Sequence, residues 1–435
     1  MRGKTIGKRT WGAFIVVGFI GQVALTVEGA YLNLFVYDTI TDNPHVIAAM
    51  VAASAIAATL ATMVMGAVSD RAGRRRAFVA VGYLLWGASM MGFGLISVDL
   101  FRPAGSVVTA VTLTIVAVIV LDCVVSIFSA GAYSATFQAW VTDVTDVTNR
   151  GRAEAVLVTL PMLSLLAAIA SFEGLARRDE WGLLFTIVGA VTMVGGVLAW
   201  FLVKDVPGIR PQRDKVFAAV VHGLRPRTIR GNPRLYLALS ALGVLSIANQ
   251  VYMPYLLIYI ERYLGIESYA LLLGVTLLAA SALSIIGGRV IDRVGKLRFI
   301  LPAAAVYATG LVLMFWARGT GAVMAAGVVV IAGFMLLAAV TAGLVRDYTP
   351  RDRTGAIQGI RILIISMVPS LIGPFIGAAV IIDANEFYLD LGVLKQVPTP
   401  GIFLAAAVVI TLIVIPVIAL RRLERVADAT PQLRP

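Results

Sequence analysis

The chain has 435 residues, of which 59% are hydrophobic and only 14% are charged, and its formal net charge is +12. With a mean hydropathy of +0.91, it has too few polar residues to cover a water-soluble globule of this size, so the bilayer must be its solvent. The basic excess then serves orientation and attraction to anionic lipid headgroups, and it needs no nucleic-acid partner.

Twelve apolar runs are long enough to cross about 30 Å of hydrocarbon, which takes roughly 20 helical residues. The first run follows a basic segment, Met1 to Thr10, but it is too long for the core of a signal peptide, so we expect it to remain as a spanning helix. The expected spans are 11–38, 47–68, 77–98, 107–140, 154–173, 181–203, 235–260, 268–288, 299–317, 321–345, 356–382 and 401–420. The predicted fold class is therefore an all-α integral membrane protein with twelve transmembrane helices.

Lys and Arg are distributed very unevenly between the two sides of these spans. Most of the 36 lie at the N-terminus, in the even-to-odd loops, in the middle segment or in the C-terminal tail. The opposite side holds only Arg102, Arg177, Arg178, Arg262, Arg318 and Lys395. By the positive-inside rule, we expect a multi-pass protein of the cytoplasmic membrane with both termini in the cytoplasm.

The segment 204–234 is the clear break in apolar character, and it contains four prolines and many basic residues. It divides the chain into an N-terminal six-helix bundle, 1–203, and a C-terminal six-helix bundle, 235–435, which ends in a short cytoplasmic tail. We interpret 204–234 itself as a cytoplasmic basic linker.

Two loop sequences recur in the same order in both halves. Gly66-Ala-Val-Ser-Asp70-Arg71-Ala-Gly73-Arg74-Arg75-Arg76 returns 222 residues later as Gly288-Arg-Val-Ile-Asp292-Arg293-Val-Gly295-Lys296-Leu-Arg298. Asp143-Val-Thr145 with Gly151-Arg-Ala-Glu154 returns 204 residues later as Asp347-Tyr-Thr349 with Gly355-Ala-Ile-Gln358. Two echoes at equivalent loops indicate a duplicated membrane domain, a pattern typical of transporters.

With these loops the chain resembles the major facilitator superfamily. The hallmark of that family is a Gly-x-x-x-Asp-Arg-x-Gly-Arg-Arg-type loop between helices 2 and 3, with a weaker copy between helices 8 and 9. The resemblance implies two pseudo-symmetric six-helix bundles that rock about a central cavity, lined mainly by helices 1, 4, 7 and 10. The expected function is secondary active transport of a small solute by alternating access, and not enzymatic catalysis.

We interpret the repeated loops as a conformational latch between the bundles, formed by Gly66, Asp70, Arg71, Gly73, Arg74, Gly288, Asp292, Arg293 and Gly295. Gly66 and Gly288 would allow a neighbouring helix to approach closely. Asp70 would face the positive N-terminal end of another helix, which the resemblance places in helix 11, near Gly355. We assign Arg75 and Arg76 to topology alone.

Two carboxylates lie inside predicted spans: Glu28 in helix 1 and Asp122 in helix 4. Each costs roughly 2.5–3.5 kcal/mol at a helix centre, and such a cost usually marks a functional site. Because a carboxyl group removed from water takes up a proton readily, we predict that Asp122 and Glu28 are the proton-coupling residues. The alternative is a protonated side chain that hydrogen-bonds to neighbouring backbone.

We expect no metal, no cofactor and no catalytic residues, and the coupling ion is expected to be H⁺. The chain has only two histidines, His45 and His222, both in presumed loops on opposite faces. Neither has the spacing of a metal site or a nucleophile motif around it.

The predicted substrate-binding residues are amide and phenol side chains on helices 1, 4 and 7. Such groups in a cavity wall suit a neutral, hydroxyl-bearing solute. Ordinary hydrogen bonding between helices is the alternative for any one of them. They are Gln22, Asn33, Tyr133, Gln138, Asn249, Gln250, Tyr252 and Tyr255.

Within the superfamily, the chain is faintly similar to the cation-coupled glycoside, pentoside and hexuronide symporters. Tyr31-Leu-Asn-Leu-Phe-Val-Tyr-Asp38 resembles the end of their helix 1, and Asp347-Tyr348 followed by Thr354-Gly355 resembles their loop before helix 11. Their helix 2 carries paired aspartates for sodium, whereas the run 46–65 has no carboxylate. The prediction therefore favours proton-coupled symport of a sugar-like or glycoside-like solute.

Two other transport functions remain open. A proton-coupled drug or multidrug exporter would be expected to carry a Gly-Pro-rich helix 5, which Leu160-Pro161-Met-Leu-Ser164 does not provide. A lipid flippase on the same fold would suit the apolar helix 10 at 321–345. The expected partners are a small-molecule substrate and membrane lipids, and we expect a monomer.

Overall fold

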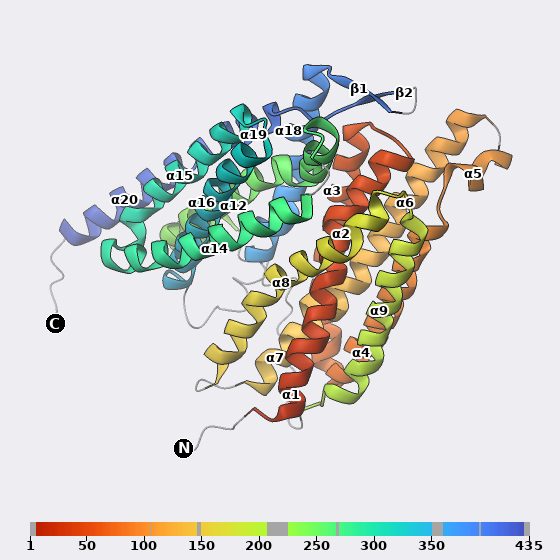
Figure 1. The fold of residues 1–435 in the computed structure, drawn as a ribbon. Helices are drawn as coiled ribbons and strands as arrows, with labels where there is room; N and C mark the ends of the chain where they lie inside the picture. Colours follow the sequence, from red (N-terminus) through yellow and green to blue (C-terminus); the bar gives the residue numbers. More distant parts are fainter. Residues whose placement is uncertain are drawn as a thin grey trace. The chain divides into compact units, whose positions relative to one another are not determined.

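The computed structural model describes residues 6–104, 106–145, 149–206, 225–266, 269–349, 360–390 and 393–429. The chain divides into two compact units, Met1–Lys215 and Val216–Pro435 (Figure 1). In the described residues, twelve helical stretches are long and apolar enough to cross a bilayer, six in each unit. The predicted twelve-helix fold is confirmed.

The N-terminal unit is a bundle of long helices that cover the predicted spans, except that the helix over 77–98 ends at Leu95. Its helices α4 and α9 pack against each other, as do α3 and α6 and α2 and α8. The elements are α1 (Lys8–Gly12), η1 (Ala13–Val17), α2 (Gly18–Thr39), α3 (Pro44–Ala72), α4 (Arg75–Gly92), η2 (Phe93–Leu95), α5 (Val98–Phe101), η3 (Arg102–Ala104), α6 (Val107–Ser129), η4 (Ala130–Phe137), α7 (Gln138–Val144), α8 (Arg150–Ala176) and α9 (Trp181–Leu202).

The C-terminal unit repeats this plan, with α15 packed against α19, α14 against α16 and α12 against α18. Its helices are α11 (Pro226–Gly231), α12 (Pro233–Tyr252), η5 (Met253–Tyr255), α13 (Leu256–Ile258), η6 (Tyr259–Tyr263), α14 (Tyr269–Val294), α15 (Lys296–Trp316), α16 (Thr320–Asp347), η8 (Leu363–Met367), α18 (Val368–Ala384), α19 (Gly401–Thr411) and α20 (Val414–Ala429). A hairpin of β1 (Phe387–Asp390) and β2 (Val393–Gln396) lies between α18 and α19, where the sequence predicted only a loop.

Local sequence sets the ends of the helices that carry the functional side chains. Asn43 caps α3, since its side-chain oxygen accepts a hydrogen bond from the His45 backbone, and Pro44 occupies the first helical position. The same helix ends at Gly73, which adopts the left-handed conformation with φ of 61°. Gly295 has φ of 88° at the matching turn of the second unit. Both repeated loops therefore depend on a glycine where an L side chain would be strained.

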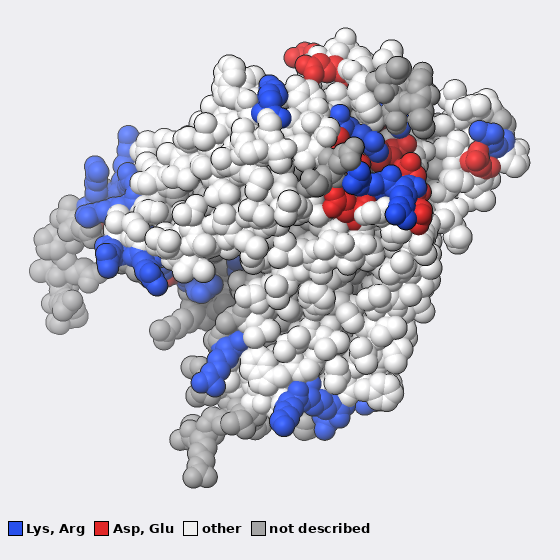
Figure 2. All heavy atoms as spheres, viewed as in Figure 1, with Lys and Arg blue, Asp and Glu red and all other residues white. Residues whose placement is uncertain are grey.

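The surface of the protein fits a hydrocarbon solvent. Figure 2 shows broad uncharged areas, with Lys and Arg gathered in separate patches. Large apolar side chains are exposed along the helices, among them Val64 in α3, Val120 in α6 and Leu271 in α14. Because a soluble protein rarely exposes so much contiguous apolar surface, these faces are the ones that contact lipid.

Candidate functional site

The two predicted proton-coupling residues lie together inside the N-terminal bundle. Glu28 projects from α2 and Asp122 from α6, and their carboxyl groups are close enough for the charge of one to affect the other. Asp122 is only 3% exposed. Ser126, one turn beyond Asp122, donates a hydrogen bond of 2.8 Å to Oε1 of Glu28. The structure thus brings together two acidic groups that are 94 residues apart in the sequence.

The neighbours of this carboxyl pair are neutral. The Ser54 hydroxyl of α3 faces Asp122, and the Trp86 indole of α4 faces Glu28. Among the described residues, no Lys, Arg or His acts on either carboxyl group. Sequence reasoning missed Ser54, Ser126 and Trp86. Only the spacing of Asp122 and Ser126, which puts both on one face of a helix, gave a usable signal.

The predicted substrate residues of the N-terminal bundle separate into two groups. Gln22 donates a hydrogen bond of 2.8 Å to the Tyr133 hydroxyl, and the Tyr133 ring stacks on Phe137. Asn33 instead donates to the Gly29 carbonyl within its own helix, at 3.1 Å. Gln138 is half-buried at the start of α7. The structure therefore joins Gln22 with Tyr133 and gives Asn33 a hydrogen bond within its own helix.

The predicted substrate residues of the C-terminal bundle make hydrogen bonds inside that bundle. Gln250 donates to Ser370 of α18 at 2.8 Å. Tyr252 donates to Oδ1 of Asn249 at 3.0 Å, and its hydroxyl lies 3.4 Å from that of Tyr307. Tyr255 donates to the Pro374 carbonyl at 2.9 Å. The Tyr252–Asn249 bond lies within α12, whereas the contacts with Ser370, Tyr307 and Pro374 join neighbouring helices. Such contacts between helices are the alternative that the sequence left open.

A buried arginine organises the repeated loop of the N-terminal bundle. Arg75 is 4% exposed, and its guanidinium forms an ion pair with Asp70. It also bonds Asp143 at 3.1 Å and the Ser69 hydroxyl at 2.6 Å. Arg75 therefore does more than fix topology, which was the role assigned to it from the sequence. The fork of a guanidinium explains how one side chain reaches three acceptors.

The other latch residues of this loop lie at the surface or in the turn. Arg71 and Arg74 are exposed, and Gly73 makes the turn. Within its own bundle, a Cβ added at Gly66 would meet only Ala135, at 4.0 Å. Close packing inside the described part of the bundle therefore does not explain Gly66.

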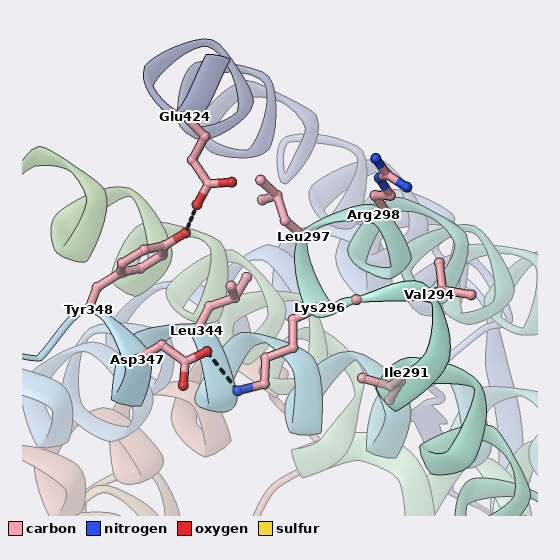
Figure 3. Close-up of a pocket in the computed structure, with 10 residues that line it drawn as sticks. Ile291, Val294, Lys296, Leu297, Arg298, Leu344, Asp347, Tyr348 and Glu424 are labelled. Atoms are coloured by element: carbon pink, nitrogen blue, oxygen red, sulfur yellow. Dashed lines mark hydrogen bonds and ion pairs between the residues drawn. The ribbon is translucent and has the colours of Figure 1, made fainter. Parts of the chain in front are cut away.

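The repeated loop of the C-terminal bundle forms a weaker counterpart. A Cβ added at Gly288 would meet no atom of the described bundle within 4 Å, and Arg293 is exposed. The side chain of Asp292 and the segment 350–359, with Gly355, lie outside the described residues. The Lys296 ammonium, next to Gly295, bonds Asp347 at 2.6 Å (Figure 3).

In each bundle, the first repeated loop sequence therefore contacts the second repeated loop sequence. Arg75 of the first loop joins Asp143 in one half, and Lys296 of the second loop joins Asp347 in the other. In the C-terminal bundle these residues border a cavity of about 620 Å³. Tyr348 donates a hydrogen bond to Glu424 of α20 across the same cavity (Figure 3). Burial, followed by that hydrogen bond, raises the pKa of the Tyr348 hydroxyl.

The sequence pattern of the Major Facilitator Superfamily matches residues 13–335 and, in a second match, 238–434. The chain belongs to this superfamily. It is therefore a membrane transporter, as the repeated loops predicted. No curated protein matches the sequence.

Solved structures of other superfamily transporters share its fold. A mutant form of the nucleoside transporter NupG has a TM-score of 0.75 at 10% identity, with 95% of this chain and 100% of that chain covered. The xylose transporter XylE from E. coli has a TM-score of 0.65 at 12% identity, covering 93% and 97%. A bacterial homologue of the human lysosomal transporter Spinster has 0.65 at 14% identity, covering 96% and 98%. At these identities the likeness concerns the fold alone.

Proposed function

We propose that this superfamily member carries a small hydroxyl-bearing solute, such as a sugar, glycoside or nucleoside, together with a proton. Transport follows alternating access, in the cytoplasmic membrane, with both termini in the cytoplasm. The observation that carries the proposal is the pair formed by the half-buried Glu28, whose Oε2 is buried, and the buried Asp122. Among the described residues, no cation acts on either carboxyl group.

Electrostatics explains why such a pair suits proton coupling. When two carboxyl groups lie side by side and away from water, ionising both has a high free-energy cost, so at least one of them holds a proton. The Ser126 hydroxyl on Glu28 and the Ser54 hydroxyl facing Asp122 can donate to a carboxylate or accept from a carboxylic acid. Each of these two hydroxyls can therefore stay in contact with the pair whether the carboxyl group beside it is charged or neutral. Neither carboxyl needs a metal or a cofactor for this step.

The polar side chains support a neutral solute. Gln22 and Tyr133 lie hydrogen-bonded to each other and offer an amide and a phenol from one bundle. In the other bundle, Asn249 and Gln250 each use one amide atom in a hydrogen bond, to Tyr252 and to Ser370, and an amide side chain has further donor and acceptor positions to offer a solute. NupG and XylE, which share the fold, are transporters of a nucleoside and of xylose. We assign Tyr252 and Tyr255, whose hydroxyls contact Tyr307 and the Pro374 carbonyl of neighbouring helices, to holding the helices together.

The repeated loops supply the conformational latch in this proposal. Asp70 carries the acidic charge of this latch, and Arg75 fixes its orientation through their ion pair. Arg71 and Arg74 are exposed beside it and available for charge contacts.

The test is solute-triggered proton movement in proteoliposomes, with sugars, glycosides, nucleosides and cationic dyes as the panel. Wild type is compared with Asp122→Asn, which keeps the size of the side chain but cannot ionise. Asp99→Asn is the matched control, because Asp99 is 74% exposed and pairs with its helix neighbour Arg102. We expect Asp122→Asn to abolish coupled flux and Asp99→Asn to retain it.

Three results would count against parts of the proposal. Solute uptake without proton movement in wild type would remove proton coupling. Proton movement in Asp122→Asn equal to wild type would remove the role of Asp122. A response to dyes alone, with protons moving against them, would show the exporter that the sequence left open.

A further inference from the structure

The indole of Trp86 is a buried hydrogen-bond donor without an acceptor. Trp86 lies in α4 with none of its surface exposed, and Nε1 has no hydrogen-bond partner among the described residues. Its ring packs edge-on against Tyr83, and the Tyr83 hydroxyl is engaged elsewhere, with the Val17 carbonyl at 3.0 Å. A buried N–H group is rarely left unbonded in a native structure, so this one calls for a functional explanation.

The carboxyl group of Glu28, which faces this indole, has a buried oxygen without a hydrogen-bond donor among the described residues. Trp86 lies against the Glu28 carboxyl group. Oε1 of Glu28 already accepts from Ser126 at 2.8 Å, but Oε2 is buried and makes no hydrogen bond within the described chain. A donor without an acceptor therefore lies beside an acceptor without a donor.

The chemistry of the two groups ties a bond between them to the charge on Glu28. An indole N–H only donates, and a carboxylate only accepts. Hydrogen bonds to an ionised acceptor are about twice as strong as neutral ones. A bond from Trp86 thus favours the carboxylate form of Glu28 over the carboxylic acid.

Asp122 is the titratable group that faces Glu28 from the described helices packed around it. Its negative charge opposes ionisation of Glu28, so Glu28 releases its proton most readily while Asp122 is protonated. The other facing groups, Ser126 and Trp86, are neutral at any physiological pH. Trp86 is therefore the donor available for the oxygen that Ser126 does not reach.

We propose that Trp86 is a positioning residue of the proton-coupling pair, whose indole N–H bonds Oε2 when Glu28 is a carboxylate. This inference rests on the proposed function, in which Glu28 and Asp122 exchange the proton. The donor is held rigidly, because α4 and α9 meet so closely beside it that a Cβ at Gly87 would clash with the backbone of Gly189. A donor fixed in advance stabilises a developing charge without reorganisation.

The test uses infrared titration of the full-length protein in liposomes, which follows the carboxylic acid C=O band and assigns Glu28 by its loss in Glu28→Gln. Trp86→Phe removes the N–H group. Replacing Trp86 with benzothienylalanine removes the N–H group but keeps the shape of the ring. This second variant provides the test if Trp86→Phe does not fold. We expect both variants to raise the pH at which Glu28 loses its proton by about one unit or more.

Trp181→Phe is the matched control. Trp181 is also buried, and its Nε1 also has no hydrogen-bond partner in the described residues. Its ring packs with Phe35 and Phe185, and it is not among the groups that act on Glu28 or Asp122. We expect this variant to leave the Glu28 titration where it is in wild type. An unshifted titration in the folded ring-shape variant, or an equal shift in Trp181→Phe, would overturn the inference.

The infrared measurement does not depend on transport, so the two proposals fail separately. If Asp122→Asn keeps coupled flux while Trp86 still controls the Glu28 titration, the proposed coupling role fails and the hydrogen bond stands. If Asp122→Asn abolishes coupled flux but the Trp86 variants leave the titration midpoint of Glu28 unchanged, the coupling role of Asp122 stands and the proposed role of Trp86 is wrong.

Discussion

The two repeated loops share one sequence plan but bury their charges very differently. In the N-terminal bundle, the 5% exposed side chain of Arg75 joins Asp70, Asp143 and Ser69. In the C-terminal bundle, Lys296 and Asp347 form one bond with side chains that are 39% and 49% exposed. In the repeat, Arg75 corresponds to Leu297 and Lys296 to Arg74. The C-terminal loop therefore has no cation at the position of Arg75, and its acidic partner Asp347 pairs with the exposed Lys296, one position earlier.

The difference shows what the duplicated sequence preserved. Both halves keep the turn glycine and the acidic partner at the end of helix 4 or helix 10, so both tie the turn to that helix. Only the N-terminal loop uses a guanidinium for this bond, which can reach several acceptors at once, whereas an ammonium acts as a point charge. We therefore expect the N-terminal loop to be the rigid one of the two.

Removing the buried cation is expected to change the free energy of unfolding most. We expect Arg75→Ala to lower the free energy of unfolding by about 3 kcal/mol, because two partly buried carboxylates lose their partner. Lys296→Ala is its counterpart, and we expect less than about 1 kcal/mol because that pair is half-exposed. Chemical unfolding of the purified protein in detergent measures both. Equal losses would contradict a difference between the loops.

Keeping the charge but changing its shape is the next test. We expect Arg75→Lys to cost about 1.5 kcal/mol, because an ammonium cannot reproduce the fork that spans Asp70, Asp143 and Ser69. The same unfolding measurement applies. A lysine variant as stable as wild type would show that charge alone holds the loop.

The acidic partners provide a smaller contrast. We expect Asp143→Asn to cost about 1 kcal/mol, since Asp70 still pairs with Arg75, and Asp347→Asn to cost a few tenths. Thermal unfolding of the two variants side by side gives the comparison. A larger loss for Asp347→Asn would reverse the ranking of the two loops.

The smallest expected change is the effect of salt on the stability loss that each variant causes. At 1 M NaCl the screening length falls to about 3 Å, so the stability difference between wild type and Lys296→Ala is expected to vanish. The loss caused by Arg75→Ala is expected to persist, because a buried pair is screened much less. Unfolding curves at low and high salt separate the two cases.

Most of the fold was predictable because hydrophobicity in a membrane protein is a local property. Spans such as 181–203 and 321–345 are long apolar runs, and the structure places helices there at Trp181–Leu202 and Thr320–Asp347. The hairpin of β1 and β2 was not predicted, because its strands of four residues each carry too short a pattern.

The candidate site was only partly predictable. Glu28 and Asp122 stood out because hydrocarbon disfavours charge. Their neighbours Ser54 and Trp86 did not stand out, because serine and tryptophan are common in spanning helices. Arg75 was misjudged, since one arginine among several in a basic loop looks like an orientation signal until its acidic partner is known.

The sequence by itself determined the solvent, the spans, the duplication and the superfamily, because each follows from composition, from run length or from motifs within one stretch of chain. Tertiary structure decided which side chains meet: Ser126 with Glu28, 98 residues away, and Arg75 with Asp143, 68 residues away. A helix that is apolar all round does not reveal which face turns inward. Only packing against its neighbours fixes that rotation, and with it the partners of every polar side chain.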